Sequence, residues 1–175
     1  MESRIISDGV IYWTLYDGTE KVCSRFDKAK WHLAVSDIDT DEEFAEVLSS
    51  CQTIKCYTLK LCCDGSSIAF IYTKYIDERN RVVSLHGGGW GGSFSSSRQY
   101  CRGIILMVKY LLEQGLKVQT SCLQENKRAF RLMHSIGFVK YRIDNGYIDM
   151  WINKERLQCS KMYRYLYPQA TFYNG

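Results

Sequence analysis

The sequence predicts an α+β protein with a mixed, mostly antiparallel twisted sheet flanked by helices. Three strand-like runs separated by turn signals, Ile54–Cys63, Ser67–Tyr75 and Arg81–His86, indicate an antiparallel meander. A helical period then joins the third run to the strand Leu116–Cys122, which favours one parallel crossover. A final pair of runs surrounds Asn-Gly, the dipeptide that most strongly favours a two-residue hairpin.

The first part of the chain carries weaker signals. Ile5–Leu15 is rich in β-branched and aromatic residues, and Asp17-Gly18 favours a turn, so a strand pair around that turn is expected. Lys30–Ser36 is another short apolar run. The capping box Thr40–Glu43 predicts a helix that runs to about Ser50.

The segment 81–138 organises the rest of the chain. The strand Arg81–His86 leads into a Gly/Ser-rich stretch, His86–Ser97, which is expected to be irregular. A helix over Ser97–Gln114 follows, and Gly115 stands where a C-cap glycine belongs. The apolar residues of this helix recur with helical spacing on one face: Ile104, Met107, Val108 and Leu111.

A second helix is expected after the strand Leu116–Cys122. Asn126 can cap it and Gly137 ends it. Its apolar face comprises Ala129, Leu132, Met133 and Ile136. The hairpin strands Phe138–Ile143 and Tyr147–Ile152 then flank Asn145-Gly146.

The glycine-rich stretch ahead of the first helix predicts an anion site. The N–H groups of a first helical turn lack partners within the helix, and the helix dipole places positive charge there. Arg98 and Arg102 add two formal charges in the same region. An ordinary loop with solvated arginines is the alternative, and the loop alone leaves both interpretations open.

The same segment resembles the core of the GNAT acyl-coenzyme A-dependent N-acyltransferases. Arg98–Gly103 reads R-x-x-C-x-G, close to the family's phosphate pattern Q/R-x-x-G-x-G/A, with Cys101 in place of the inner glycine. Asn126, Ala129 and Gly137-Phe138 hold the places of the family's second helix. The resemblance covers roughly Ile54 to Ile152, and residues 1–53 have no clear counterpart.

This resemblance implies one GNAT-like domain over residues 1–175, with its core at 54–152. It implies an N-acetyltransferase that moves an acetyl group from acetyl-CoA to an amine by direct attack in a ternary complex, without a metal. A backbone N–H of the strand before the loop would polarise the thioester carbonyl. The residues expected to bind acetyl-CoA are Arg98, Gln99, Tyr100, Cys101, Arg102, Gly103 and Asn126.

His86 is the candidate general base, because an imidazole with a pKa of about 6.5 can accept a proton near neutral pH. Hydrogen bonding to the loop backbone is its alternative role, and Glu78 and Glu125 are weaker candidates. Met133 stands where many members of the family carry a proton-donating tyrosine, so Ser121, Cys122 or a tyrosine elsewhere would have to serve. A catalytically degenerate binding or interaction module is the alternative function.

Composition narrows the remaining possibilities. The 175 residues, 46% hydrophobic and 24% charged with a net charge of +4, are typical of a globular domain that attracts anions. No apolar run is long enough to cross a bilayer and no signal peptide is visible, so a cytoplasmic location without membrane contact is expected. The eight cysteines contain no C-x-x-C pair, which favours reduced thiols over disulfides or zinc.

The sequence also indicates which molecules the protein would bind. A small-molecule or peptide amine is the expected acceptor, and its identity is not encoded in any motif. Lys127, Arg128 and Arg131 form a polar helix face that is either solvated or near the phosphate end of the coenzyme. The aromatic and basic tail Cys159–Gly175 is expected to pack on the domain or to form a homodimer contact, in preference to binding nucleic acid.

Overall fold

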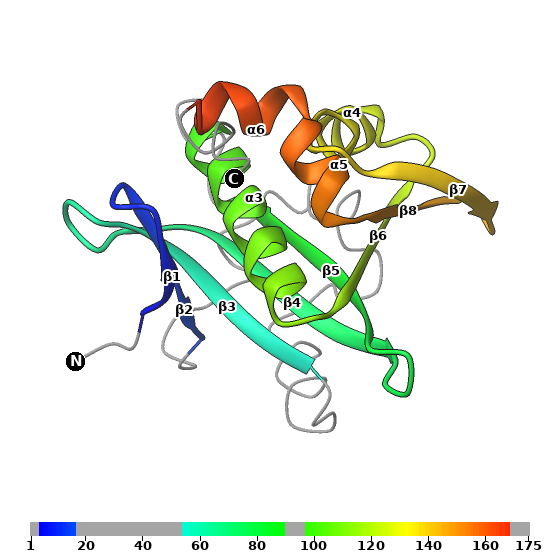
Figure 1. Cartoon of the computed structure of the whole chain (residues 1–175), viewed down its shortest axis with the longest axis horizontal. Coiled ribbons are helices and arrows are strands. Elements are labelled where there is room, and N and C mark those ends of the chain that lie inside the picture. Colours follow the sequence, from blue (N-terminus) through cyan, green and yellow to red (C-terminus); the bar gives the residue numbers. More distant parts are fainter. Residues whose placement is uncertain (1–3, 17–53, 90–96, 169–175) are drawn as a thin grey trace, which may run out of the picture.

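The computed structural model describes residues 4–16, 54–89 and 97–168. Within these ranges eight strands form one sheet in the order β1-β2-β3-β4-β5-β6-β8-β7 (Figure 1). The strands are β1 (Arg4–Ser7), β2 (Ile11–Leu15), β3 (Ile54–Leu61), β4 (Ser67–Asp77), β5 (Val82–Gly89), β6 (Lys117–Leu123), β7 (Val139–Asp144) and β8 (Tyr147–Ile152). The helices are α3 (Ser97–Glu113), α4 (Lys127–Ile136), α5 (Lys154–Cys159) and α6 (Lys161–Leu166).

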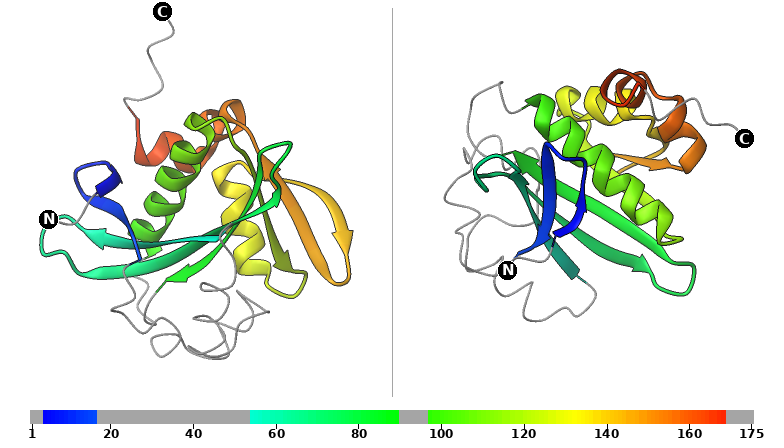
Figure 2. Two further views of the ribbon diagram at one scale, coloured as in Figure 1. Left: turned by 90° about the horizontal axis from the view of Figure 1, so that it is seen from below. Right: turned by 60° about the vertical axis from the view of Figure 1, so that its left-hand side comes forward.

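The predicted fold class is confirmed. Neighbouring strands pair antiparallel except β5 and β6, which are parallel and are joined through α3. The β7–β8 turn has positive φ at Asn145 (46°) and Gly146 (81°), as an Asn-Gly hairpin requires. Figure 2 shows the twist of the sheet and α3 crossing one of its faces.

The predicted start of the sheet needs correction. Ile5–Leu15 is not one run, because the chain turns at Asp8-Gly9 and pairs β1 with β2. The Asp8 carboxylate accepts the N–H groups of Val10 (2.9 Å) and Ile11 (3.1 Å), and Gly9 takes φ 87°, so this turn is built from local interactions. The predicted turn at Asp17-Gly18, the run Lys30–Ser36 and the helix to Ser50 lie outside the described residues.

The strand before the loop also differs from its prediction. Arg81 belongs to the preceding turn, with φ 57°, and β5 continues beyond His86 to Gly89. Gly87, Gly88 and Gly89 therefore pair with β4 and are not loop residues. Glycine is required at position 87 by close packing, because a Cβ there would lie 2.3 Å from the carbonyl oxygen of Phe70. Glycine here marks a close backbone approach within a sheet.

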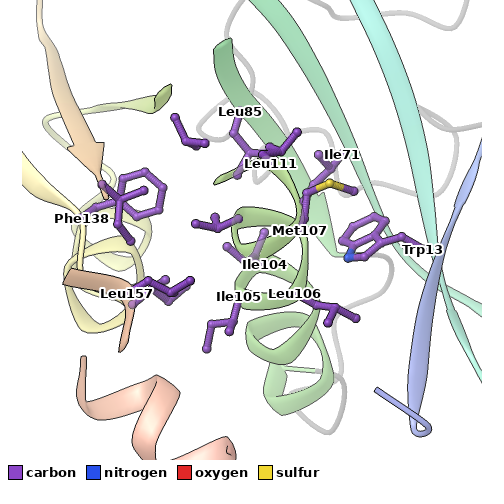
Figure 3. Close-up of a cluster of buried hydrophobic side chains, with 14 of the residues drawn as sticks. Trp13, Ile71, Leu85, Ile104, Ile105, Leu106, Met107, Leu111, Phe138 and Leu157 are labelled. Atoms are coloured by element: carbon purple, nitrogen blue, oxygen red, sulfur yellow. The ribbon is translucent and has the colours of Figure 1, made fainter. Parts of the chain in front are cut away.

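Helix α3 is the centre of the hydrophobic core. The four predicted core residues are all buried, and Gly115 ends the helix with φ 74°. The expectation of a single apolar face is incomplete, because Ile105 and Leu106, which lie outside that face, are buried too. Figure 3 shows why: Met107 points towards Trp13 and Ile71 of the sheet, while Ile105 lies on the side of Leu157 in α5.

The C-terminal tail, in its described part, packs on the domain as expected. It forms the short helix α6 and follows the short helix α5, which ends at Cys159; neither helix was predicted from the sequence. Tyr163 and Leu166 are buried in the core, and α6 contacts both α3 and α4. None of the described helices is long and apolar enough to cross a bilayer.

Candidate functional site

The parallel strands β5 and β6 separate along their length, as Figure 1 shows. They pair only over Val82–Ser84 and Lys117–Gln119. Beyond this point β5 stays with β4 up to Gly89, and β6 stays with β8 up to Leu123. We call this feature the β5–β6 divergence, formed by residues 85–89 and 120–123. Along this stretch the facing edges of β5 and β6 do not pair with each other as they would in an intact sheet.

Thr120 marks the start of the divergence. Its buried Oγ1 donates a 2.8 Å hydrogen bond to the carbonyl oxygen of Leu85, in place of a backbone donor from β6. Backbone groups of alternate residues point to the same edge of a strand, so the N–H and C=O of Gly87 face the same side as those of Leu85. The divergence thus offers backbone donors and acceptors of β5 to an extended ligand.

His86 lies on the face of β5 that points away from α3, beside this divergence. Its Nε2 is 2.5 Å from the Oγ of Ser84, two residues earlier on the same face. The ring of Tyr72, directly opposite on β4, stacks on the imidazole with centroids 5.1 Å apart and an interplanar angle of 22°. His86 is half-buried, whereas the rival bases Glu78 and Glu125 are exposed in turns. The geometry holds one imidazole in a fixed orientation.

The start of α3 contains the predicted phosphate pattern. Arg98 is exposed, and its guanidinium carbon lies 5.3 Å from the ring centre of Tyr165 in α6. The Oε1 atom of Gln99 is buried without a hydrogen-bond partner. Tyr100 and Cys101 pack partly against the core, where burial raises the pKa of both side chains. Only Arg98 of these four presents a charge to solvent.

Gly103 is a packing residue. A Cβ at this position would lie 2.2 Å from the Cδ2 of the buried Leu59, so glycine lets α3 approach β3. The carbonyl oxygen of Gly103 accepts a 2.8 Å hydrogen bond from the Nε1 of Trp13. These contacts anchor the helix to the sheet, and they account for the glycine without a ligand.

Arg102 is held by an ion pair that the sequence did not reveal. Its Nε and Nη2 donate to Asp8 Oδ2 at 2.9 and 2.6 Å, and its Cζ lies 5.4 Å from the ring centre of Tyr167. The Tyr167 hydroxyl donates to the same oxygen at 2.6 Å. Burial favours the neutral acid, but the hydrogen bonds from Tyr167, the backbone and Arg102 outweigh it and lower the pKa of Asp8. Much of the positive charge of Arg102 is therefore neutralised within the protein.

Helix α4 begins as predicted. The Oδ1 of Asn126 accepts the N–H of Ala129 at 3.0 Å, so the side-chain oxygen serves as the N-cap. The three basic residues of the outer face, Lys127, Arg128 and Arg131, are exposed, and so is His134. At the position of the absent tyrosine, Met133 packs partly against the core.

The alternative proton donors differ in their surroundings. Cys122 is buried on the core side of β6, and burial raises the pKa of its thiol. Ser121 lies on the opposite face and is half-buried. Sequence reasoning missed Ser84 and Tyr72; the two-residue spacing of Ser84 and His86 could have indicated the first. The position of Tyr72 depends on a strand register that no local pattern sets.

Comparison with known proteins was informative at the level of structure. No protein-family model matches the chain, and no curated protein sequence matches it. Among solved structures, the spermidine N-acetyltransferase of Vibrio cholerae, in complex with CoA and spermine, is 12% identical with a TM-score of 0.68, covering 86% of this chain and 99% of its own. FdhC, described as a nucleotide-linked sugar GNAT in its apo form, is 12% identical with a TM-score of 0.70, covering 98% and 99%.

A third similar structure is a GNAT-family acetyltransferase from Bacillus anthracis. It is 15% identical with a TM-score of 0.64, covering 89% of this chain and 98% of its own. The chain has the fold of the GNAT N-acetyltransferases.

Proposed function

We propose that the protein is an acetyltransferase that transfers the acetyl group of acetyl-CoA to an amine within a ternary complex. The observation that carries this proposal is the β5–β6 divergence, which is followed in the chain, after residues 90–96, by the N-terminus of α3. An extended thioester-bearing arm fits along a strand edge, and a diphosphate fits at the start of a helix. Both features occur here in one GNAT fold.

The coenzyme would lie with its pantetheine arm along β5 and its diphosphate at the start of α3. The N–H of Gly87 is the donor that would meet the thioester carbonyl, because it faces the divergence two residues beyond Leu85. Arg98 supplies the exposed charge, with the first-turn N–H groups of Ser97, Arg98 and Gln99, which have no partner within the helix. Arg102, Gly103 and Asn126 would act mainly by fixing the helices, since the hydrogen bonds described above join them to other parts of the protein.

The chemistry requires an uncharged amine. An alkylammonium has a pKa of about 10, so a base must remove its proton before attack. His86 is placed to do this beside the divergence. The amine nitrogen then attacks the carbonyl carbon, the C–N bond forms, the C–S bond breaks and the thiolate leaves. The acylated nitrogen loses its extra proton, which the thiolate takes up, so the products are a neutral amide and free CoA thiol. A thiol with a pKa of about 8.5 is a tolerable leaving group, so Met133 in place of tyrosine slows this step without preventing it.

The acceptor class remains open within this proposal. A small-molecule or peptide amine fits the reaction, and the similar Vibrio cholerae structure is described as a spermidine N-acetyltransferase. The six described cysteines are free thiols, which supports a reducing, cytoplasmic location.

A degenerate binding module is the second candidate. It is favoured by Met133 in the place of the proton donor and by the neutralisation of Arg102 by Asp8. The two candidates share a coenzyme site and differ in turnover.

Release of free thiol from acetyl-CoA in the presence of a panel of amines tests the proposal, alongside thermal shift with acetyl-CoA and with CoA. Acetyltransfer predicts stabilisation by both ligands and thiol release with at least one amine, which His86→Ala reduces near neutral pH. Stabilisation without thiol release from any amine would establish the binding module. Absence of stabilisation by either ligand would remove the coenzyme site altogether.

A further inference from the structure

The ladder between β5 and β6 begins as a regular series of backbone hydrogen bonds. The N–H of Lys117 donates to the carbonyl oxygen of Arg81 at 2.9 Å. In a parallel pair such bonds recur at every second residue of each strand. The register therefore continues the series with the N–H of Gln119 and the carbonyl oxygen of Val83.

A side chain occupies the next place in this series. A continued ladder would join the N–H of Ser121 to the carbonyl oxygen of Leu85, but the pairing stops at Ser84. The carbonyl oxygen of Leu85 instead accepts the 2.8 Å hydrogen bond from Thr120 Oγ1. Thr120 is 5% exposed and Leu85 is 2% exposed. A buried carbonyl needs a donor, and Thr120 supplies it from within the protein.

Thr120 can do this because its backbone and its side chain reach different strands. The residue pairs with Met150 of β8, and successive residues of a strand turn their backbone groups to opposite edges. Only the hydroxyl of Thr120 therefore reaches β5. This bond satisfies the Leu85 carbonyl without drawing the backbone of Ser121 towards it. The ladder ends, and the N–H of Ser121 faces the divergence.

We propose that Thr120 is a positioning residue that ends the β5–β6 ladder and presents the N–H of Ser121 to the coenzyme. This inference rests on the proposed function, in which the pantetheine arm lies along β5. The arm contains amides, whose carbonyl oxygens accept hydrogen bonds from the backbone N–H groups of a strand edge. With Gly87 on one wall and Ser121 on the other, the divergence offers the arm a donor from each strand.

Hydrogen exchange of the protein without ligand tests the ladder. In the wild type, the amide proton of Ser121 should exchange about tenfold faster than that of Gln119, because only Gln119 is paired with β5. Thr120→Val keeps the shape of the side chain and removes the hydroxyl. The Leu85 carbonyl should then accept the N–H of Ser121, so exchange at Ser121 should slow by about tenfold. Thr120→Ser retains the hydroxyl and should keep the wild-type pattern.

Calorimetric titration supplies the second readout. CoA is compared with its nucleotide part, which lacks the pantetheine arm. Thr120→Val should weaken CoA binding by about tenfold, the size expected for one lost hydrogen bond, and should leave binding of the nucleotide part unchanged. A general loss of stability would weaken both ligands alike. Thr58→Val removes another buried hydroxyl, on β3, and should leave both affinities unchanged.

Equal exchange at Ser121 and Gln119 in the wild type would overturn the proposal, and that comparison does not depend on any variant folding. The proposal also fails if Thr120→Val matches the wild type in Ser121 exchange and in CoA affinity. If the wild type binds neither CoA nor acetyl-CoA, the proposed function fails. Hydrogen exchange still decides by itself whether Thr120 ends the ladder.

Discussion

Replacing Arg102 by methionine tests whether this residue holds the fold together. The substitution keeps most of the aliphatic stem and removes the guanidinium, with its hydrogen bonds of 2.9 and 2.6 Å to Asp8. The side chains of Arg102 and Asp8 are only 18% and 6% exposed. Asp8 would remain as a buried carboxylate held by Tyr167 and by backbone N–H groups.

The expected cost follows from that geometry. Removing one partner of a buried ion pair destabilises a protein by about 3–5 kcal/mol. The remaining donors on Asp8 place this variant at the lower end, about 3 kcal/mol, since part of the carboxylate stays satisfied. For a chain of this size each kcal/mol lowers Tm by roughly 2–4 °C, so a fall of about 6–12 °C is expected.

Urea unfolding and thermal melts measure this cost, with Lys109→Met as the control. Lys109 pairs with Glu113 on the same helix at 2.6 Å, but both side chains are more than two-fifths exposed. Its loss should change stability by no more than about 0.5 kcal/mol. If Arg102→Met is as stable as Lys109→Met, the Asp8 contact does not hold α3 to the β1–β2 turn. Loss of CoA affinity with unchanged stability would instead assign Arg102 to the phosphate site.

Three further outcomes are expected. The pKa of Asp8 is lowered in the folded protein, so the Asp8 carboxylate stabilises the fold fully above its unfolded pKa of about 3.9. This stabilisation is lost as the pH falls through the folded pKa. The difference in stability between wild type and Asp8→Asn should therefore close in urea titrations below about pH 4. Gly87→Ala should lower the free energy of unfolding by about 3 kcal/mol, because the added Cβ meets the backbone of β4. Gly146→Ala is the control, since that turn has open space and the substitution tests φ strain alone. Equal melting temperatures for Gly87→Ala and wild type would contradict the close approach. Asn126→Ala should cost about 1 kcal/mol through the lost α4 cap, measured by chemical denaturation, and a neutral result would show that the cap is dispensable.

Local patterns were sufficient for most elements of the core. The period of α3, the Asn126 cap and the Asn145-Gly146 turn depend on residues close in sequence, and each is found where it was predicted. Glycines caused the main error in the predicted bounds of the elements. A glycine that permits close packing, such as Gly87, looks the same in sequence as one that ends a strand.

The candidate site was predictable only in outline. His86 and the start of α3 could be named because a strand-like run, a Gly/Ser-rich stretch and a helical period follow one another in the sequence. Their partners could not, because Arg102 meets Asp8 across 94 residues of sequence and Asp8 meets Tyr167 across 159. Such contacts depend on where whole elements come to lie, and no local spacing encodes that.

The sequence by itself determined the order of the elements from β3 to β8, the single parallel crossover and one of the buried faces of α3. Short-range hydrogen bonding and side-chain periodicity are sufficient for these features. Only the tertiary structure decided that β5 and β6 diverge after Ser84, that Tyr72 covers His86 and that the charge of Arg102 is neutralised. Those outcomes depend on strand register and helix packing, which balance contacts between segments far apart in the chain.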